Sequence, residues 1–371
     1  MIDNKLRSYI EFYFQVFDYL KNDFSENNPL PPLHIYIEPT NNCNLNCPFC
    51  ATSLLRRKRK NLDFGLYKRA IDSIFNNGWS KFVRLTLTGQ GEPLLYKRLP
   101  DMIWYAKQKD FLSIELITNG TLLNKETGKA LIESGLDRIQ FSFDSIRKDT
   151  YDSLRRARTK GKSYFYNTIT NILNFLMLNS ENGFSVYTSI SAVSTSLNSD
   201  ERDSFVVFRD SLPVDNIFFS TLSTLQNNSP TAEALRFNGN IKTKPICIIP
   251  WISLSVKSSG DIVVCSHDYN NTYVVGNIEN DDIFELWNNE KTRKLRKALI
   301  DGELDDFVNI NHDCYSCNNP CIGCGRDDFL KDIPVYMEKT VIGKLAKSRE
   351  YDLKKIQKIG ETLESLKRIL F

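Results

Sequence analysis

The sequence predicts an α/β fold, a partial (β/α)6 TIM-like barrel followed by a small cysteine-rich domain and a helix. The first observation is a regular alternation of strand-like and helix-like segments between residues 34 and 220. Such alternation builds a parallel sheet from βα units, and six strands suit an open barrel better than a closed one of eight. The second observation is that the nine cysteines fall in two groups, with none in residues 51–246. Two groups predict two cysteine-bearing sites in different regions.

A helix comes first, because residues 8–20 place five apolar side chains on one helical face: Ile10, Tyr13, Phe14, Phe17 and Leu20. Short apolar segments then predict six strands, at residues 33–40, 82–89, 113–120, 137–145, 186–194 and 216–223. Segments with helical spacing lie between them, at residues 64–78, 99–110, 124–135, 163–179 and 200–212.

The βα rhythm stops near residue 240. Residues 247–265 have the pattern of a β-hairpin, residues 276–302 that of a loop and a helix, and the tail again shows helical spacing. We therefore predict four units along the chain: an N-terminal helix over 1–30, the barrel over 31–235, the cysteine-rich domain over 240–330 and a helical tail over 335–371.

Composition narrows the class of protein. A formal net charge of +3 gives no reason to expect a nucleic-acid partner. No apolar run approaches the roughly 18 residues of a membrane span, and the acidic, polar N-terminus matches neither a signal nor a transit peptide. We expect a cytoplasmic protein. Because disulfides are rare in that compartment, nine cysteines point to metal or redox chemistry.

The first cysteine group is a compact loop directly after the first predicted strand. Cys43, Cys47 and Cys50 have the spacing Cys-x3-Cys-x2-Cys. Three thiolates suit a [4Fe–4S] cluster with one iron left open, whereas a closed zinc site needs four ligands. Zinc with a distant fourth ligand, or three unrelated thiols, are the alternatives.

This loop resembles the hallmark of the radical S-adenosylmethionine (radical SAM) superfamily, and Phe49 before the third cysteine also fits. The resemblance implies that the three cysteines hold a [4Fe–4S] cluster whose open iron binds S-adenosylmethionine. It further implies reductive cleavage of that cofactor to methionine and a 5′-deoxyadenosyl radical, which abstracts a substrate hydrogen. The electron would come from an external donor of the flavodoxin or ferredoxin type.

Later segments continue the resemblance in chain order. The stretch GQGEP resembles the family's Gly-Gly-Glu-Pro segment, which implies that Gly91 and Glu92 meet the cofactor's amino group. Glycine permits close backbone approach, and a carboxylate suits an ammonium group. The following strands imply further cofactor contacts: Thr118, Asn119, Ser142, Asp144, Arg155 with Arg156 as its alternative, and Ser189 or Ser191.

The second cysteine group resembles the SPASM extension of radical SAM enzymes and its shorter Twitch relative, which bind auxiliary iron–sulfur clusters. Cys247 and the Gly260-x4-Cys265 spacing carry this resemblance. Six thiols cannot fill two complete clusters. The simplest account is one auxiliary [4Fe–4S] cluster held by Cys247, Cys265, Cys314 and Cys317.

Cys321 and Cys324 would then be spare. Alternatively they help to hold a second cluster, replace other ligands, form a zinc site, or supply a hydrogen-atom donor. His267 and His312 lie near these cysteines, and either could ligate the metal or donate a hydrogen bond to sulfur. His34 is expected to be structural.

A basic run, Arg56 to Lys60, follows the cysteine loop. It is either a solvated loop or an anion contact at the barrel mouth, in which case Arg57 or Arg59 would be the residue to test.

The resemblance implies an enzyme of the oxidoreductase or maturase type. We favour a peptide or protein side chain as substrate, modified by oxidation, crosslinking or epimerisation. The alternatives are a dehydrogenase or epimerase acting on a sugar or aminoglycoside-type molecule, and a non-catalytic iron–sulfur sensor or electron carrier. Neither a leader-peptide-binding domain nor a cobalamin domain is expected before residue 34.

Overall fold

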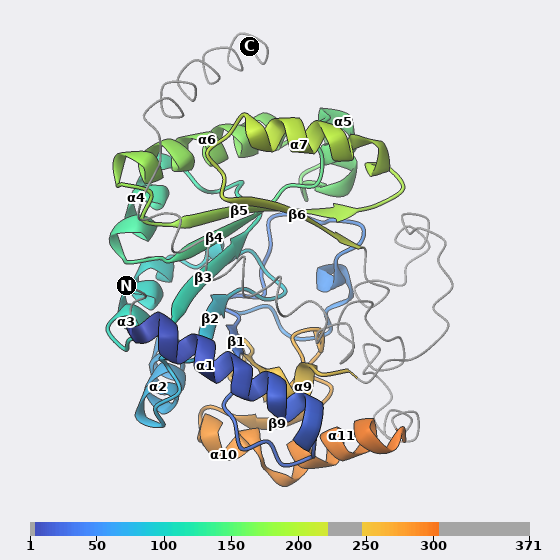
Figure 1. Ribbon diagram of the computed structural model, residues 1–371. Coiled ribbons are helices and arrows are strands. Elements are labelled where there is room, and N and C mark those ends of the chain that lie inside the picture. The colour runs from blue at the N-terminus through green and yellow to red at the C-terminus, as the bar shows by residue number, and fades with distance from the viewer. Residues whose placement is uncertain (1–3, 222–246, 304–371) are drawn as a thin grey trace.

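The computed structural model describes residues 4–221 and 247–303. Six parallel strands alternate with helices along the chain (Figure 1). Neighbouring strands pair in sequence order, each with the one before it. The strands are β1 His34–Ile37, β2 Arg84–Leu87, β3 Ser113–Thr118, β4 Arg138–Ser142, β5 Tyr187–Ser194 and β6 Asn216–Thr221. The predicted open barrel of six parallel strands is confirmed.

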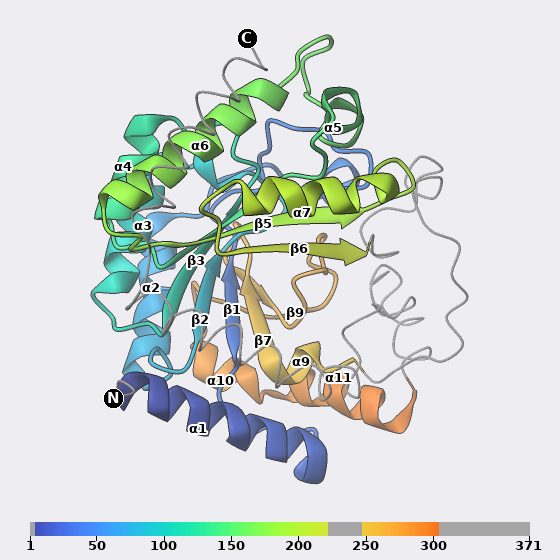
Figure 2. The ribbon, with the colours of Figure 1, turned by 45° about the horizontal axis from the view of Figure 1, so that its top comes forward.

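The helices cover the outer face of this curved sheet (Figures 1 and 2). Side-chain caps fix where two of them begin: Asp63 accepts from the N–H groups of Gly65 and Leu66, and Asn124 from that of Thr127. The predicted helices are α2 Phe64–Asn76, α3 Leu99–Lys107, α4 Lys125–Glu133, α6 Phe165–Glu181 and α7 Arg202–Asp210. A short additional helix, α5 Lys148–Leu154, follows β4.

The predicted hairpin is built onto the barrel sheet. Its first strand, β7 Ser253–Val256, pairs in parallel with β1, and β8 Asp261–Val263 pairs antiparallel with β7. With β9 Val274–Asn277 the sheet has nine strands in the order β6-β5-β4-β3-β2-β1-β7-β8-β9. The first part of the cysteine-rich region therefore shares one sheet with the barrel. Three helices flank it: α9 Ile249–Ile252, α10 Ile283–Trp287 and α11 Glu290–Asp301.

The N-terminal helix is present, and Tyr13 and Leu20 of its predicted face are buried, with Phe17 packed partly buried on the core. It spans α1 Asn4–Asp18 and continues as a π-helical turn, Tyr19–Asp23. Phe14 is 57% exposed, while Phe12 and Val16 are buried. The prediction that Phe14 belongs to the buried face is wrong: the buried face extends over Phe12 instead, which packs on Phe82 at 4.6 Å between ring centroids.

Several predicted features lie outside the described residues: Cys314, Cys317, Cys321, Cys324, His312 and the helical tail over 335–371. Within the described ranges, none of the helices combines the length and apolar character needed to span a membrane.

Candidate cofactor and cluster site

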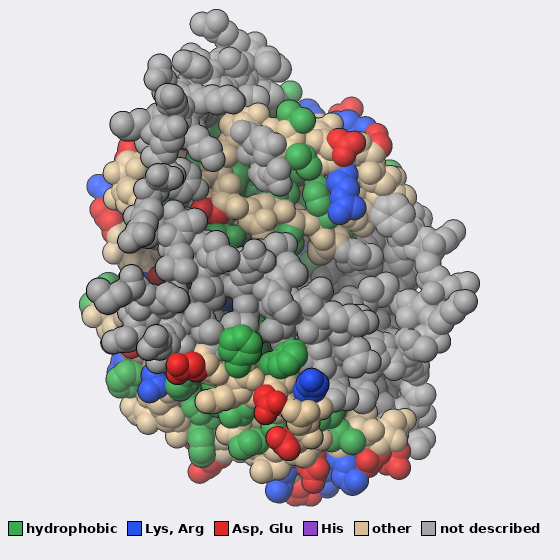
Figure 3. Space-filling view, viewed as in Figure 1, with side chains coloured by type: hydrophobic (Ala, Val, Ile, Leu, Met, Phe, Trp, Pro, Cys, Tyr) green, Lys and Arg blue, Asp and Glu red, His purple; other side chains and the backbone are tan. Residues whose placement is uncertain are grey.

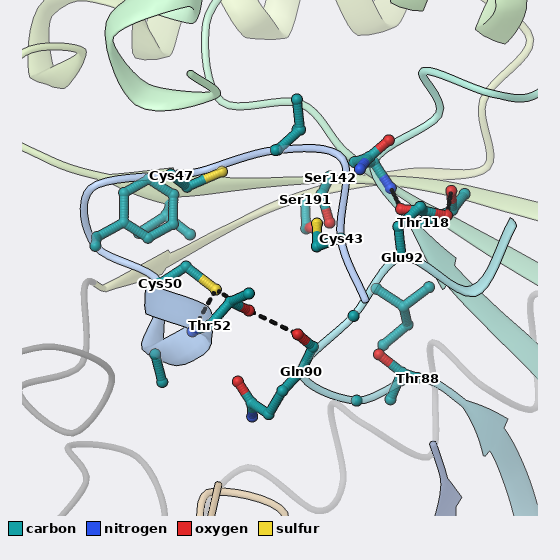
Figure 4. A pocket seen from close by; sticks show the side chains of 18 of the residues that line it. Cys43, Cys47, Cys50, Thr52, Thr88, Gln90, Glu92, Thr118, Ser142 and Ser191 are labelled. Carbon is teal, nitrogen blue, oxygen red and sulfur yellow. Dashed lines mark hydrogen bonds between the residues drawn. The ribbon is translucent and has the colours of Figure 1, made fainter. Parts of the chain in front are cut away.

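A cavity of about 450 Å³ opens at the carboxyl ends of the barrel strands, within the range of ligand-binding pockets. All three cysteines of the first group line it, and Figure 4 shows them around one space. Further lining residues come from the ends of all six barrel strands and from the loop after β8: Tyr36, Thr88, Gln90, Glu92, Thr118, Asn119, Gln140, Ser142, Arg155, Ser191, Phe218, Ser220, Ser266, His267 and Tyr269.

The cysteine loop makes two kinds of contact: apolar packing around Cys47 and hydrogen bonds around Cys50. Cys47 is buried with Leu45, Phe49 and Leu154 in a small apolar cluster. The Cys50 thiol donates to Thr52 Oγ1 at 3.1 Å, and that hydroxyl donates to the carbonyl of Gln90 at 2.7 Å (Figure 4). The loop is therefore anchored to the turn after β2.

Burial governs the protonation of the Cys43 and Cys47 thiols. Desolvation raises the pKa of Cys43 to about 11 and that of Cys47 to about 12. Without metal they would stay protonated at neutral pH, and metal binding would have to displace their protons. The protonation of these two cysteines therefore differs between the empty and the metal-bound site.

The geometry of the three thiols fits a cluster better than a single ion. In the described ranges, no three Cys, His, Asp or Glu side chains converge closely enough to hold one metal ion. In an iron–sulfur cluster each thiolate binds its own iron at a separate corner. Three separated thiols around one cavity therefore fit the predicted [4Fe–4S] group, and the zinc alternative lacks a fourth ligand among the described residues.

The two glycines of GQGEP let the turn after β2 pack closely against Glu38 and against the residues that lead into the cysteine loop. A Cβ on Gly91 would stand 2.5 Å from the carbonyl oxygen of Asn42. A Cβ on Gly89 would stand 2.4 Å from Cγ of Glu38. Both approaches are closer than any real side chain tolerates. These close approaches pack the turn on the protein itself, and Gly89 and Gly91 also line the cavity.

Glu92 is fully enclosed, and in-chain donors occupy most of its carboxylate. Oε1 accepts from Thr118 Oγ1 at 2.6 Å and from the N–H of Leu94 at 3.0 Å; Oε2 accepts from the N–H of Asn119 at 2.8 Å. A carboxylate has about four acceptor sites, so about one remains on Oε2. Burial raises the pKa of Glu92 against these hydrogen bonds.

Asn119 joins the end of β3 to the cysteine loop. Its amide donates to Asn44 Oδ1 at 3.0 Å, and Asn44 in turn donates to Thr121 Oγ1 at 2.7 Å. Thr121 closes the ring by donating to Asn119 Oδ1 at 2.7 Å. Asn44, which the sequence did not single out, is therefore part of the framework that orients this loop.

Of the residues predicted on later strands, Arg155 and Ser142 line the cavity, and Asp144 and Ser189 do not. Asp144 is buried and binds Arg155 by two hydrogen bonds, Nε to Oδ2 at 2.5 Å and Nη2 to Oδ1 at 3.1 Å. Ser189 points to the carbonyl of Ile139 at 3.4 Å. Ser191, its alternative, does line the cavity, and Arg156 is exposed outside it.

Comparison with known families now identifies the chain. The model of the radical SAM superfamily matches residues 37–204, and that of the iron–sulfur cluster-binding SPASM domain matches residues 247–325. This chain belongs to the radical SAM superfamily. It is an enzyme superfamily, and the present member carries a SPASM domain, as the resemblance implied.

Individual relatives are distant. A tungsten-containing aldehyde ferredoxin oxidoreductase cofactor-modifying protein of Pyrococcus furiosus is 24% identical over 361 residues, covering 82% of this chain and 98% of the relative. PqqA peptide cyclase of Gluconobacter oxydans is 33% identical over 119 residues, 32% of each chain. The chain thus spans nearly the whole of the first relative and about a third of the second.

A solved structure shares the fold. Streptococcus suis SuiB bound to precursor peptide SuiA superposes with a TM-score of 0.56 at 17% identity, over 76% of this chain and 69% of that one. At this identity the likeness concerns the fold alone.

The two matched domains imply the cofactors. A radical SAM domain implies a [4Fe–4S] cluster with S-adenosylmethionine, and a SPASM domain implies auxiliary iron–sulfur clusters. The SPASM match spans all six cysteines of the second group. Of these, Cys247 and Cys265 flank β7 and β8, and His267, two residues after Cys265, lines the cavity.

Glu38, directly after β1, is a buried carboxylate beside the radical SAM site that the sequence analysis did not identify. It is 1% exposed and receives two hydrogen bonds from Arg57, at 2.9 and 3.0 Å. The N–H of Gln90 and the hydroxyl and N–H of Ser258 also donate to it, at 2.9, 2.8 and 3.0 Å. One carboxylate therefore joins the cysteine-loop region, the GQGEP turn and the β7–β8 turn.

This finding also changes the interpretation of the basic run. Arg57 is committed to Glu38, and Arg59 donates to the carbonyls of Asn41 and Thr52. Neither the solvated loop nor the anion contact describes these two side chains. The only sequence signal for Glu38 was a charged residue at the end of an apolar strand, next to a basic run.

Proposed function

We propose that Cys43, Cys47 and Cys50 hold the radical SAM [4Fe–4S] cluster and that S-adenosylmethionine lies beside it in the 450 Å³ cavity. The single observation that carries this is the meeting of three thiols, Glu92 and Arg155 around one space. When bound, the cluster and the cofactor supply one-electron chemistry that yields a 5′-deoxyadenosyl radical for hydrogen abstraction.

The residues of the chain would bind and orient the cofactor. The remaining acceptor site of Glu92 suits the cofactor's ammonium group, and Thr118 and Asn119 hold that carboxylate in place. Arg155, fixed by Asp144, still has further N–H donors for the cofactor's carboxylate.

For the substrate we propose a peptide or protein side chain, oxidised, crosslinked or epimerised. Among the described residues, β6 is an edge strand of the sheet, and its residues Phe218 and Ser220 line the cavity. An extended peptide can add to such an edge through main-chain hydrogen bonds while one side chain enters the adjacent cavity. The partial identity with a peptide cyclase supports this choice.

A small polyhydroxylated molecule, such as an aminoglycoside precursor, is the second candidate. The observation favouring it is the wall formed by Gln140, Ser142, Ser191 and Ser220, which offers hydroxyl and amide groups without charge. In either case an auxiliary cluster held by SPASM cysteines, Cys247 and Cys265 among them, would take up an electron from the substrate or anchor it.

The test is anaerobic reconstitution with iron and sulfide, reduction, and quantification of 5′-deoxyadenosine and methionine. The proposal expects equimolar release of both. An intact cluster that releases no 5′-deoxyadenosine would refute the proposal and favour a non-catalytic iron–sulfur sensor or electron carrier. Deuterium transfer into 5′-deoxyadenosine from labelled peptides, compared with labelled aminocyclitols, would then separate the two substrate classes.

A further inference from the structure

One basic segment contains the cysteine loop, and a second segment contacts it. Residues 41–62 carry five Lys or Arg and no Asp or Glu, and residues 155–164 carry another five, again with no acid. Since the whole chain has a formal net charge of only +3, the remaining residues are net negative. Positive charge is therefore concentrated at one place in the fold.

Hydrogen bonds fix both segments to the loop. Lys58 and Lys60 accept from Asn41 through their backbone carbonyls, at 3.0 and 3.2 Å. On the other side, the N–H of Asn46 donates to the carbonyl of Arg156 at 2.7 Å, and Arg158 Nε donates to the carbonyl of Cys43 at 2.7 Å. The cations therefore keep a defined position relative to the cysteines.

Some of this charge is already used inside the protein. Arg57 and Arg155 face the buried carboxylates of Glu38 and Asp144. The exposed remainder, called here the basic rim, includes Arg56, Lys58, Arg156, Arg158, Lys160 and Lys162. The antiparallel bridge between Leu45 and Ala157 also holds the two segments next to each other.

None of the six residues of the basic rim lines the cavity. A substrate held in the cavity would thus not need these cations. A partner touching the rim would instead contact the outer side of the loop that carries the three cysteines. For a radical SAM enzyme, the partner that must approach this loop from outside is the one that delivers the electron.

We infer that the basic rim is the docking surface for a small acidic electron carrier of the flavodoxin or ferredoxin class. This inference rests on the proposed function of the cysteine loop. In the step concerned, the reduced carrier loses one electron and the cluster gains it, with no bond made or broken. Electron-transfer encounters are small and transient, and complementary charge speeds them by about 10- to 1,000-fold at low salt.

The test compares two triple variants of the reconstituted enzyme. The first is Lys58→Glu/Lys160→Glu/Lys162→Glu in the rim. The matched control is Lys81→Glu/Lys294→Glu/Lys297→Glu, whose lysines are also exposed and lie elsewhere. Both change the formal net charge from +3 to −3. Around α11, acidic and basic side chains already alternate, as Figure 3 shows along the lower edge of the molecule.

Two readouts do not depend on turnover: the Kd for reduced flavodoxin, and the rate at which flavodoxin bleaches the cluster absorbance in stopped-flow mixing. Photoreduced 5-deazariboflavin, a small uncharged reductant, is measured alongside. We expect the rim variant to lose about 10- to 100-fold in the flavodoxin rate at low salt, and the loss to vanish at high salt. The control and the deazaflavin rates should change less than about twofold.

Three outcomes would overturn the inference. Equal flavodoxin rates and Kd values in rim and control variants would remove the docking surface. If the rim variant were reduced equally slowly by flavodoxin and by deazaflavin, the rim would act by balancing the negative charge of the cluster and not by binding the carrier. Normal flavodoxin reduction with impaired binding of an acidic peptide would assign the rim to the substrate. Failure of the wild type to cleave S-adenosylmethionine with deazaflavin would refute the proposed function while leaving the docking measurements valid.

Discussion

The two halves of the barrel treat the cavity differently. On the β1–β3 side, the polar groups at the strand ends are bound to one another: Glu38 to Arg57, Glu92 to Thr118, and Asn119 to Asn44. On the β4–β6 side, Ser142, Phe218 and Ser220 line the cavity, and among the described residues the two serine hydroxyls make no hydrogen bond. The first half is preorganised, and the second offers open groups.

This difference matches the division of work in the proposed function. A cofactor that is the same in every turnover is best held by side chains locked through neighbouring hydrogen bonds. A substrate needs groups that are still available to bind. If the division is real, substitutions of the locked groups should damage stability and cofactor chemistry, and substitutions of the open groups Ser142, Phe218 and Ser220 should affect the substrate alone.

The largest effect is expected from Cys47→Ala. It removes a cluster ligand from the most enclosed position of the loop, so cofactor cleavage should fall to the background level without any added substrate. Cluster content is checked by iron quantification and Mössbauer spectroscopy, and cleavage by 5′-deoxyadenosine release. Cys265→Ala is the matched control and should retain the first cluster. Complete loss of iron in a Cys43/Cys47/Cys50 triple alanine variant would contradict the auxiliary cluster.

Next comes Glu38→Gln, which leaves the Arg57 guanidinium buried without its counter-charge. Removing one partner of a buried ion pair costs about 3–5 kcal/mol. Chemical denaturation should show this loss of unfolding free energy. The control is Asp101→Asn, which breaks an exposed pair with Arg98 and should change stability by less than about 1 kcal/mol. Equal losses of unfolding free energy from the two substitutions would mean that the hydrogen bonds of Glu38 do not stabilise the β1–β3 side.

The same carboxylate gives a pH dependence. The hydrogen bonds and charges of Arg57 and Lys257 overcome the effect of burial and lower the pKa of Glu38 from 4.5 to about 2. Its stabilising contribution is therefore complete above pH 4.5 and is lost as the pH falls through about 2. The difference in unfolding free energy between the wild type and Glu38→Gln should narrow over that window. A difference that stays constant with pH would show that the negative charge of Glu38 is not the source of its stabilising effect.

A smaller effect is expected from Glu92→Gln. The amide replaces one acceptor oxygen by a donor, so one of the N–H or O–H groups that point at Glu92 loses its partner at a cost of about 1–3 kcal/mol. The Kd for S-adenosylmethionine, measured by calorimetry, should rise about tenfold or more for the lost ammonium contact. Glu133→Gln on the exposed face of α4 is the control. An unchanged Kd would limit Glu92 to a structural role.

The sequence could predict the fold because the βα alternation is local: each strand and helix carries its own periodicity. It also located the cysteines, Glu92 and Arg155, since these residues sit in contiguous motifs. It could not find Glu38, whose partners Gln90 and Ser258 are 52 and 220 positions away and meet only after β1 pairs with β2 and β7. Nor could it tell that Asp144 serves Arg155 instead of the cavity, because both alternatives have the same sequence pattern.

The smallest effect on stability is expected on the open side, from Phe218→Ala. Phe218 is 36% exposed, so truncating it should cost far less than the 3–5 kcal/mol typical of a buried phenylalanine. Cofactor cleavage without substrate should stay at the wild-type level, since the cysteine loop and its hydrogen bonds are untouched. With a peptide substrate, KM should rise, because the edge of β6 loses its one large apolar contact toward the cavity.

Ser142→Ala makes the complementary test on β4. If the substrate is a peptide seated along β6, KM should respond to Phe218→Ala more strongly than to Ser142→Ala. If it is a polyhydroxylated small molecule, the lost hydroxyl should weigh more, because buried polar groups left unpaired discriminate strongly. Loss of uncoupled cofactor cleavage in either variant would mean that the β4–β6 side also holds the cofactor, and the division between the two halves would fail.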